Sequence, residues 1–278
     1  MPQVTVLMPV YNREEYIADA VTSVLKQTFR SFRLFILDDG STDRTVSIIR
    51  RFNDPRIVLK RMKHDYINTL NKGLELVDTP YFARMDADDI MPKERLAIQV
   101  SLMNEFPEID ICGGWMTVFG KGIAPTVKQT LAGYIKEPLV EMLRGNILFN
   151  PTTMCRTAFF HRHDIHYKRY VHAEDMQFWC DAAKHGAGFF VESQILNYYR
   201  HRQEQISCVY NQEQQTTALT IRAECLEWLM IHRIHDTDIH AFYQAAGTLK
   251  NKAYLNDMPY YAMFYNLIKE YISNQSRL

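Results

Sequence analysis

The first ninety residues alternate between short apolar runs and amphipathic segments. Apolar runs of strand length, rich in β-branched and aromatic residues, lie at residues 4–10, 34–37, 57–59 and 81–85. Between these runs, apolar residues recur at helical spacing within residues 14–27 and 67–77, and Val46 and Ile49 mark a further helix. Four strand–helix alternations are typical of a parallel sheet whose two faces are covered by helices. We therefore expect an α/β domain at the N-terminus.

Beyond residue 93 the alternation becomes irregular. We expect helices over residues 93–105 and 174–185, and strands over 111–118, 152–156 and 189–199. Residues 120–136 contain three glycines and a proline, which favour a mobile loop. After residue 211 the pattern predicts only helices, at residues 212–232, 238–252 and 259–273. The predicted organisation is a catalytic domain over residues 1–210 and a helical region over residues 211–278.

Composition narrows the possible partners and compartment. Lys+Arg and Asp+Glu both number 32, so there is no global field that would attract nucleic acid. The five cysteines show no C-x-x-C spacing, which favours reduced thiols. The N-terminus does not resemble a signal peptide, and no apolar stretch is long enough to cross a bilayer. We expect a cytoplasmic protein, at most peripheral on the inner face of the membrane.

An acidic tetrad, Asp86-Ala87-Asp88-Asp89, closes the fourth predicted strand. Its three carboxylates repel one another unless a positive charge lies between them. The nearest basic residue in sequence is Arg84, outside the tetrad, so we expect a divalent metal to neutralise it. Oxygen ligands favour Mg²⁺ or Mn²⁺, which usually complete their shell with substrate phosphates. The alternative is a solvated acidic turn before the helix that begins near Pro92.

Two further turns follow the first and second predicted strands. Ligands bind beyond the carboxyl ends of strands in such sheets, so the turns and the tetrad are expected to face one cleft. Tyr11 suits stacking on a flat base, and Asp39 suits acceptance of the imide N–H of uracil. Ordinary packing of Tyr11 and an Asx-turn at Asp39 are the alternatives. No G-x-G-x-x-G follows the first strand, and the spacing of Gly114–Lys121 does not match a P-loop.

Five motifs resemble, in order and spacing, those of the family 2 glycosyltransferases of GT-A fold. They are Pro9–Asn12, Asp38–Asp43, Ala83–Asp89, the Glu174-Asp175 pair within Ala173–Trp179, and a Y-R-x-H…S segment running from Tyr199 to Ser207. The resemblance covers about residues 3–210. It implies an α/β fold with a Rossmann-like mixed sheet, a nucleotide-sugar donor and inverting transfer of a single sugar.

The same resemblance implies roles for individual residues. The residues expected to bind the donor nucleotide are Pro9, Tyr11, Asn12, Asp38, Asp39, Arg84, Asp86 and Ala87. Asp88 is expected to hold the metal, with Asp86 and His201 as further metal contacts. Asp175 is the expected catalytic base, with Glu174 beside it. Both acids also suit the first turn of a helix, where the dipole stabilises negative charge.

Within the family, the segment from Ala173 to Tyr210 looks most like bacterial lipooligosaccharide β-1,3-N-acetylhexosaminyltransferases. Residues 149–154 depart from the His-Asn-Asn-Thr-Met stretch of those enzymes. The resemblance implies a UDP-N-acetylhexosamine donor and a saccharide acceptor, which a lipid carrier could bear, in surface-glycan or lipopolysaccharide synthesis. UDP-galactose or UDP-glucose is the alternative donor. A non-catalytic nucleotide-sugar-binding module remains a competing hypothesis, whereas a nucleotidyltransferase would need a Gly/Arg-rich loop that residues 11–15 do not provide.

Three other features carry weaker hypotheses. Trp115 and Trp179 suit either an acceptor platform or the core. The histidines His161, His163 and His166 suggest a basic surface more than a zinc site. The last helix carries a broad apolar arc that must be covered. We expect it to dock on the catalytic domain or on a second subunit, with contact to the membrane as the alternative.

Overall fold

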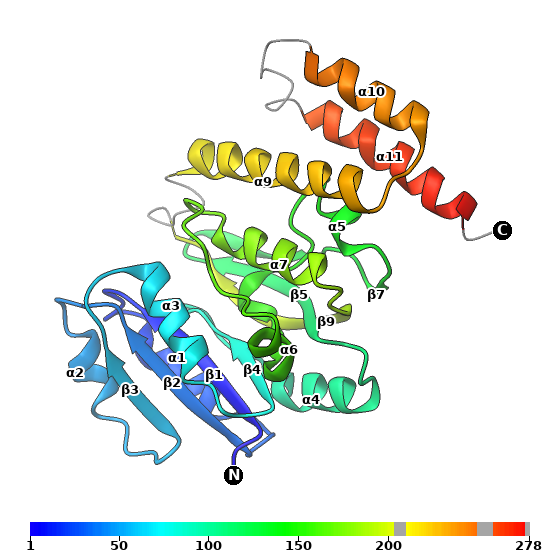
Figure 1. Ribbon diagram of the computed structural model, residues 1–278. Coiled ribbons are helices and arrows are strands. Elements are labelled where there is room, and N and C mark those ends of the chain that lie inside the picture. The colour runs from blue at the N-terminus through cyan, green and yellow to red at the C-terminus, as the bar shows by residue number, and fades with distance from the viewer. Residues whose placement is uncertain (203–209, 249–257, 276–278) are drawn as a thin grey trace. The chain divides into compact units, whose positions relative to one another are not determined.

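The computed structural model describes residues 1–202, 210–248 and 258–275 (Figure 1). The chain divides into two compact units, each built from separate stretches of sequence. Unit one comprises Met1–Lys136, Leu148–Lys168 and His185–Gln203, and unit two comprises Glu137–Ile147, Arg169–Lys184 and Glu204–Leu278. The predicted Ser207 of the closing motif lies outside the described residues.

Unit one contains a nine-stranded mixed sheet. In chain order its strands are β1 Val4–Val10, β2 Phe32–Asp38, β3 Ile57–Arg61, β4 Tyr81–Arg84, β5 Ile111–Gly120, β6 Ile123–Lys128, β7 Gly133–Ile135, β8 Met154–Arg156 and β9 Phe189–Arg200. The spatial order is β3-β2-β1-β4-β8-β5-β9-β7, with β6 paired to β5. The four N-terminal strands are parallel, as predicted, and Figure 1 shows them side by side in blue to cyan.

Strands β1, β2 and β4 are buried on both faces, which explains their largely apolar sequences, whereas β3 is partly exposed. On one face Val4, Val6 and Met8 join a core with apolar side chains of α1 (Ile17–Leu25) and α4 (Arg95–Glu105). On the other face lies α3 (Tyr66–Glu75), where a Cβ at Gly73 would come within 2.5 Å of Leu37 Cδ1. The remaining helices of unit one are α2 Thr45–Ile49, α6 Thr157–Arg162 and the 3₁₀ turn Asn150–Thr152.

The prediction of a loop over residues 120–136 is wrong. Strand β6 pairs antiparallel with β5, and β7 pairs antiparallel with β9. All six residues of β6 are exposed, so this strand has no buried face, and its proline and the glycines before it favour a loop in the sequence pattern. Backbone hydrogen bonds to β5 hold it in place.

Unit two joins the predicted C-terminal helices to two earlier helices. They are α5 Pro138–Glu141, α7 Glu174–Lys184, α9 Asn211–His232, α10 Thr237–Thr248 and α11 Met258–Gln275. In α11 the apolar arc is covered within this unit: Tyr261 and Phe264 are fully buried, and Phe264 packs against the rings of Phe242 and Tyr243 from α10. Lys269 forms an ion pair with Glu141 of α5. Helices of the same unit therefore cover most of the arc, and of these only α5 belongs to the predicted catalytic domain, while docking on a second subunit stays a prediction.

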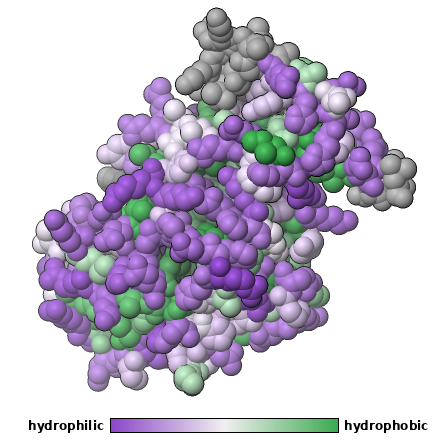
Figure 2. All heavy atoms as spheres, viewed as in Figure 1, coloured by the Kyte–Doolittle hydropathy of each residue, from purple (hydrophilic) through white to green (hydrophobic). Residues whose placement is uncertain are grey.

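The visible surface is largely polar. Figure 2 shows hydrophilic residues spread over this face, with apolar residues in smaller patches between them. Among the described residues, no helix combines the length and hydropathy needed to span a bilayer.

One buried cation ties the sheet to the segment before β8. Arg95 is fully buried, and burial lowers its pKa to about 9. Its guanidinium donates to the Gln99 side chain and to the carbonyl oxygens of Arg84, Pro151 and Thr153. It thereby fixes the end of β4, immediately before the tetrad.

We expect Arg95→Met to lower the free energy of unfolding by about 3 kcal/mol, because buried carbonyl oxygens lose their donor. The matched control is Arg44→Met, which removes an exposed guanidinium bound to Glu14 and should leave stability unchanged. Urea denaturation of both variants measures the difference. Equal midpoints for Arg95→Met and the wild-type protein would contradict this role.

Candidate functional site

The turns after β1, β2 and β4 lie together in unit one because these strands are neighbours. Asp39 N donates to Val10 O over 2.8 Å, and Asn12 N donates to Ser41 Oγ over 3.0 Å. Arg13 Nε reaches Asp88 Oδ2 at 3.1 Å. The structure thus brings the predicted base-binding turns and the acidic tetrad into one constellation.

The two predicted base-binding residues meet at a histidine that the sequence did not single out. The Tyr11 ring, 39% exposed, stacks on the His64 imidazole with centroids 4.3 Å apart. His64 Nδ1 lies 2.9 Å from Asp39 Oδ2, while Asp39 Oδ1 accepts from Asp65 N and the Thr69 hydroxyl. Tyr11 and Asp39 therefore present a stacking face and an acceptor to the same ring.

Other predicted donor-binding residues have supporting positions. Asn12 has a φ of 49°, and its side-chain oxygen accepts from Thr42 N, which holds the turn after β2. The fully buried Asp38 accepts from Ser41 N and pairs with Arg61. Pro9 and Ala87 are both buried. These residues shape the turns.

Within the tetrad, Asp86 and Asp89 each have protein partners. Arg84 donates to Asp86 Oδ1 over 3.1 Å, and desolvation raises the pKa of Asp86 despite this guanidinium. Asp89 is fully buried and accepts from Asn197 Nδ2 and Arg200 N. Burial and the neighbouring carboxylates raise the pKa of Asp89 well above its usual range. Asp89 therefore anchors the tetrad to β9.

Asp88 corrects the sequence-based argument for a metal. Its Oδ2 accepts from Arg13 Nε and also from the Arg202 guanidinium, and its backbone oxygen accepts from Arg200 Nε. The inference that the tetrad lacks a cationic partner is wrong, because its partners are distant in sequence. Arg13, in the turn after β1, and Arg202, in the closing segment, supply the positive charge, and both are far from the tetrad in sequence.

The residues offer a metal few protein ligands. Among the described residues, no three His, Cys, Asp or Glu side chains cluster as metal ligands. The predicted His201 contributes a backbone N–H to Phe119 O, and none of its described side-chain contacts reaches Asp86 or Asp88. Two carboxylates are still a donor set that Mg²⁺ or Mn²⁺ accepts when substrate phosphates complete the shell. The fit is therefore to a metal that arrives with a nucleotide.

The predicted base lies in unit two, in the first turn of α7. Asp175 is partly exposed, and its Oδ2 accepts from Asn146 Nδ2 over 3.1 Å, while its Oδ1 accepts from Met176 N. Glu174 precedes it at the start of the same helix. Both the helix-capping and the reactive interpretation suit this position. Asn146 is an orienting partner that no sequence motif indicated.

The weaker hypotheses separate clearly. Trp179 is fully buried beside Phe178, so it belongs to the core of unit two and is no platform. Trp115 is partly buried, and its Nε1 donates to Leu131 O. The histidines at 161, 163 and 166 form no metal cluster among the described residues, and they lie in a largely exposed basic segment as expected.

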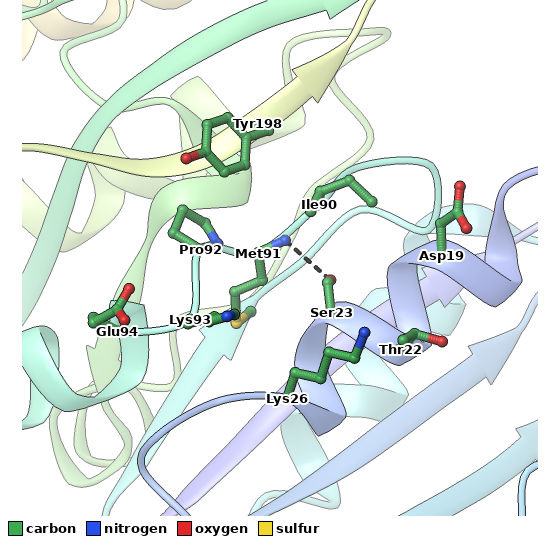
Figure 3. Close-up of a pocket in the computed structure, with 10 residues that line it drawn as sticks. All are labelled: Asp19, Thr22, Ser23, Lys26, Ile90, Met91, Pro92, Lys93, Glu94 and Tyr198. Atoms are coloured by element: carbon green, nitrogen blue, oxygen red, sulfur yellow. Dashed lines mark hydrogen bonds between the residues drawn. The ribbon is translucent and has the colours of Figure 1, made fainter.

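A pocket of about 470 Å³ in unit one lies between α1 and residues 90–94, directly after the tetrad (Figure 3). Its ten lining residues include Tyr198 but none of the predicted donor-binding residues. Two of the lining residues are joined by a hydrogen bond, in which Ser23 Oγ accepts from Met91 N over 3.0 Å. Ile90 pairs with Tyr198 of β9 in an isolated bridge. The pocket lining therefore includes the residue that directly follows the tetrad and a residue of β9.

Comparisons with known proteins bear on the fold and the family. Two solved structures share the fold. TarS 1-349 of Staphylococcus aureus in complex with UDP-GlcNAc aligns with a TM-score of 0.67 at 21% identity, over 82% of this chain and 70% of that one. The mannosyltransferase PcManGT of Pyrobaculum calidifontis, in complex with GDP-Man and Mn²⁺, aligns with a TM-score of 0.57 at 16% identity, over 96% and 86%. The predicted GT-A-type mixed α/β fold with C-terminal helices is confirmed.

A glycosyltransferase of Haemophilus influenzae, described as uncharacterized, is 31% identical over 242 residues, which are 82% of this chain and 75% of the relative. WfgD of Escherichia coli, named a UDP-Glc:alpha-D-GlcNAc-diphosphoundecaprenol beta-1,3-glucosyltransferase, is 28% identical over 65% of this chain and 70% of its own length. Neither name matches the predicted lipooligosaccharide subfamily. The model of "Glycosyl transferase family 2" matches residues 5–170, more than half of the chain. The chain belongs to glycosyl transferase family 2.

Proposed function

We propose that this protein transfers one sugar from a UDP-sugar to a saccharide acceptor, with inversion at the anomeric carbon. The observation that carries the proposal is the constellation in unit one, where Tyr11 and Asp39 lie on turns joined to Asp88 through Arg13. A site for a nucleoside diphosphate needs a flat ring on which the base stacks, a hydrogen-bond acceptor for the base, and a charged group that binds the phosphates. The competing non-catalytic module would share these contacts but not turnover.

In the proposed donor site, uracil stacks on Tyr11 and donates its imide N–H to Asp39. Asp86 faces the ribose, and the guanidinium groups around Asp88 receive the diphosphate. Arginine suits phosphate because its planar fork donates two parallel hydrogen bonds. Charge that develops on the leaving diphosphate is then met by positive groups already in place.

We propose that the site takes Mn²⁺ or Mg²⁺ when the nucleotide is bound. Asp86 and Asp88 would hold the ion together with the nucleotide phosphates. Such an ion acts as a Lewis acid that neutralises charge on the leaving group. The Pyrobaculum mannosyltransferase, which shares this fold, was solved in complex with GDP-Man and Mn²⁺, and this supports the proposed ion.

Asp175 is the proposed base that takes the proton of the acceptor hydroxyl as the glycosidic bond forms. Asn146 Nδ2 fixes one carboxylate oxygen, so the other is directed by the backbone of the first turn of α7. A single base opposite the leaving group implies direct displacement, so an α-linked donor gives a β-linked product. Glu174 is proposed to add negative charge beside the base.

The donor sugar and acceptor follow from resemblance and from the named relatives. We propose an N-acetylhexosamine, as in the UDP-GlcNAc complex of TarS, with glucose or galactose as the second candidate, as in the name of WfgD. A lipid-linked saccharide on the inner face of the cell membrane, in lipooligosaccharide or related surface-glycan synthesis, suits both. Residues 1–210 are proposed as the catalytic domain.

A thermal-shift screen of nucleotide sugars, each with EDTA and with Mn²⁺, tests the donor class. A ligand that binds only the native state raises the melting temperature. UDP-GlcNAc or another UDP-sugar should raise it, and UDP alone should do so too. A response to GDP- or dTDP-sugars with none to UDP would contradict the proposal.

Two substitutions, one at Tyr11 and one at His64, test the proposed uracil site. Tyr11→Ala should weaken UDP binding by about 10- to 100-fold, because a stacked base is lost. His64→Ala should strengthen UDP binding by about threefold, because the imidazole no longer occupies Tyr11 and Asp39. Isothermal titration calorimetry with UDP measures both. Weaker UDP binding by His64→Ala would show that the His64 ring helps to bind uracil and does not occupy the place of uracil.

A further inference from the structure

The closing motif of the sequence departs from its pattern at one residue. Where Y-R-x-H…S has a histidine, this chain has Arg202. The Arg202 guanidinium donates to Asp88 Oδ2, and its side chain is only 12% exposed. A permanently charged group therefore replaces an imidazole, which can be neutral, at the carboxylate proposed to hold a metal.

Arg202 retains an unused donor. Its Nε is buried and has no hydrogen-bond partner among the described residues. The guanidinium also lies over the Tyr16 ring, with its carbon 5.2 Å from the centroid, and Arg200 lies over the same ring at 5.0 Å. A buried donor without an acceptor is costly, so an incoming phosphate oxygen would relieve it.

Three arginine side chains converge on Asp88. Arg13 and Arg202 share one carboxylate oxygen, and Arg200 binds the backbone oxygen of the same residue. Arg200 is also paired with Asp19, and Asp86 with Arg84, so those carboxylates are already compensated. Asp88 alone thus faces two guanidinium groups. A divalent cation approaching Asp88 is repelled by both, whereas a diphosphate is attracted.

We infer that Arg202 binds the donor diphosphate and competes with divalent metal for Asp88, so that donor binding in this chain depends only weakly on metal. The inference rests on the proposed function, because it presumes a nucleoside diphosphate at this site. In the absence of donor, Asp88 holds Arg13 and Arg202 in place. When the diphosphate binds, its oxygens take over donors of Arg202, including Nε.

The test compares wild type with Arg202→His, which restores the residue of the pattern, and Arg202→Gln, which removes the charge. Isothermal titration calorimetry measures the dissociation constant of UDP in EDTA and in Mn²⁺. Electron paramagnetic resonance of free Mn²⁺ measures metal binding directly, with and without UDP. Arg44→His is the matched control, because it removes a guanidinium from an exposed ion pair with Glu14. Melting temperatures confirm that each variant is folded.

In wild type the UDP dissociation constant should differ by less than about threefold between EDTA and Mn²⁺. Arg202→Gln should weaken UDP binding in EDTA by about 10- to 100-fold, as expected for a lost hydrogen bond to a charged group. Arg202→His should bind Mn²⁺ about tenfold more tightly than wild type when UDP is present. Arg44→His should match wild type in all three measurements.

Two results would overturn the inference in different ways. UDP binding by wild type that requires Mn²⁺, or wild-type affinity in Arg202→Gln, would contradict the role of Arg202 and leave the proposed function standing. Absence of UDP binding in both buffers would contradict the proposed function itself, and this inference with it.

Discussion

Asp88→Asn should lower kcat/KM for sugar transfer by about 10²- to 10³-fold, the loss seen when one preorganised charge-stabilising group is removed. The amide is neutral, so it holds the Arg13 and Arg202 guanidinium groups less strongly before the donor binds, and it contributes no charged ligand to a metal. UDP binding should persist, because both guanidinium groups remain. The measurement is initial rate against UDP-sugar concentration, together with UDP titration.

Asp54→Asn is the matched control for this substitution. Asp54 also accepts from an arginine, Arg56, but none of its contacts involves the tetrad or the turns beside it. Its variant should retain full activity. Equal rates for Asp88→Asn and Asp54→Asn would show that Asp88 has no role in sugar transfer.

Asp175→Asn should stop transfer, with a fall of about 10²- to 10⁴-fold in kcat, because a general base contributes that much to rate. Donor binding should be unchanged, since the base acts on the acceptor hydroxyl. Asn146→Ala should show a smaller loss, because it releases one oxygen of the carboxylate without removing it. Asp181→Asn, on the same helix, is the control. A variant of Asp175 that no longer binds UDP would assign this residue to the donor site.

The N-terminal half of the fold could be predicted because burial on both faces leaves a simple trace in sequence. Strands β1, β2 and β4 are continuous apolar runs, and the helices between them repeat apolar residues at helical spacing. Strand β6 has no such trace, since every residue in it is exposed and its pairing depends on backbone hydrogen bonds. The short β7 was missed for a similar reason, as only Ile135 is buried in it.

The candidate site was predicted where motifs follow strands directly, and missed where partners are distant in sequence. Asp88 meets Arg13 across 75 positions and Arg202 across 114, so the sequence around the tetrad contained no sign of either cation. His64 lies in no motif, yet it contacts both Tyr11 and Asp39. One signal was present: Arg202 stands where the closing pattern has a histidine, and a changed residue at a motif position marks changed chemistry.

Slow hydrolysis of UDP-sugars, followed by proton NMR, tests both the donor and the inversion directly, because it needs no acceptor. With UDP-GlcNAc or the preferred UDP-sugar, wild-type protein should release UDP, and the anomeric signal of the free sugar should appear first as the β-anomer. Asp88→Asn should release both products about 10²- to 10³-fold more slowly. Release of the α-anomer first would contradict inversion, and consumption of GDP- or dTDP-sugars with no reaction of any UDP-sugar would contradict the proposed donor.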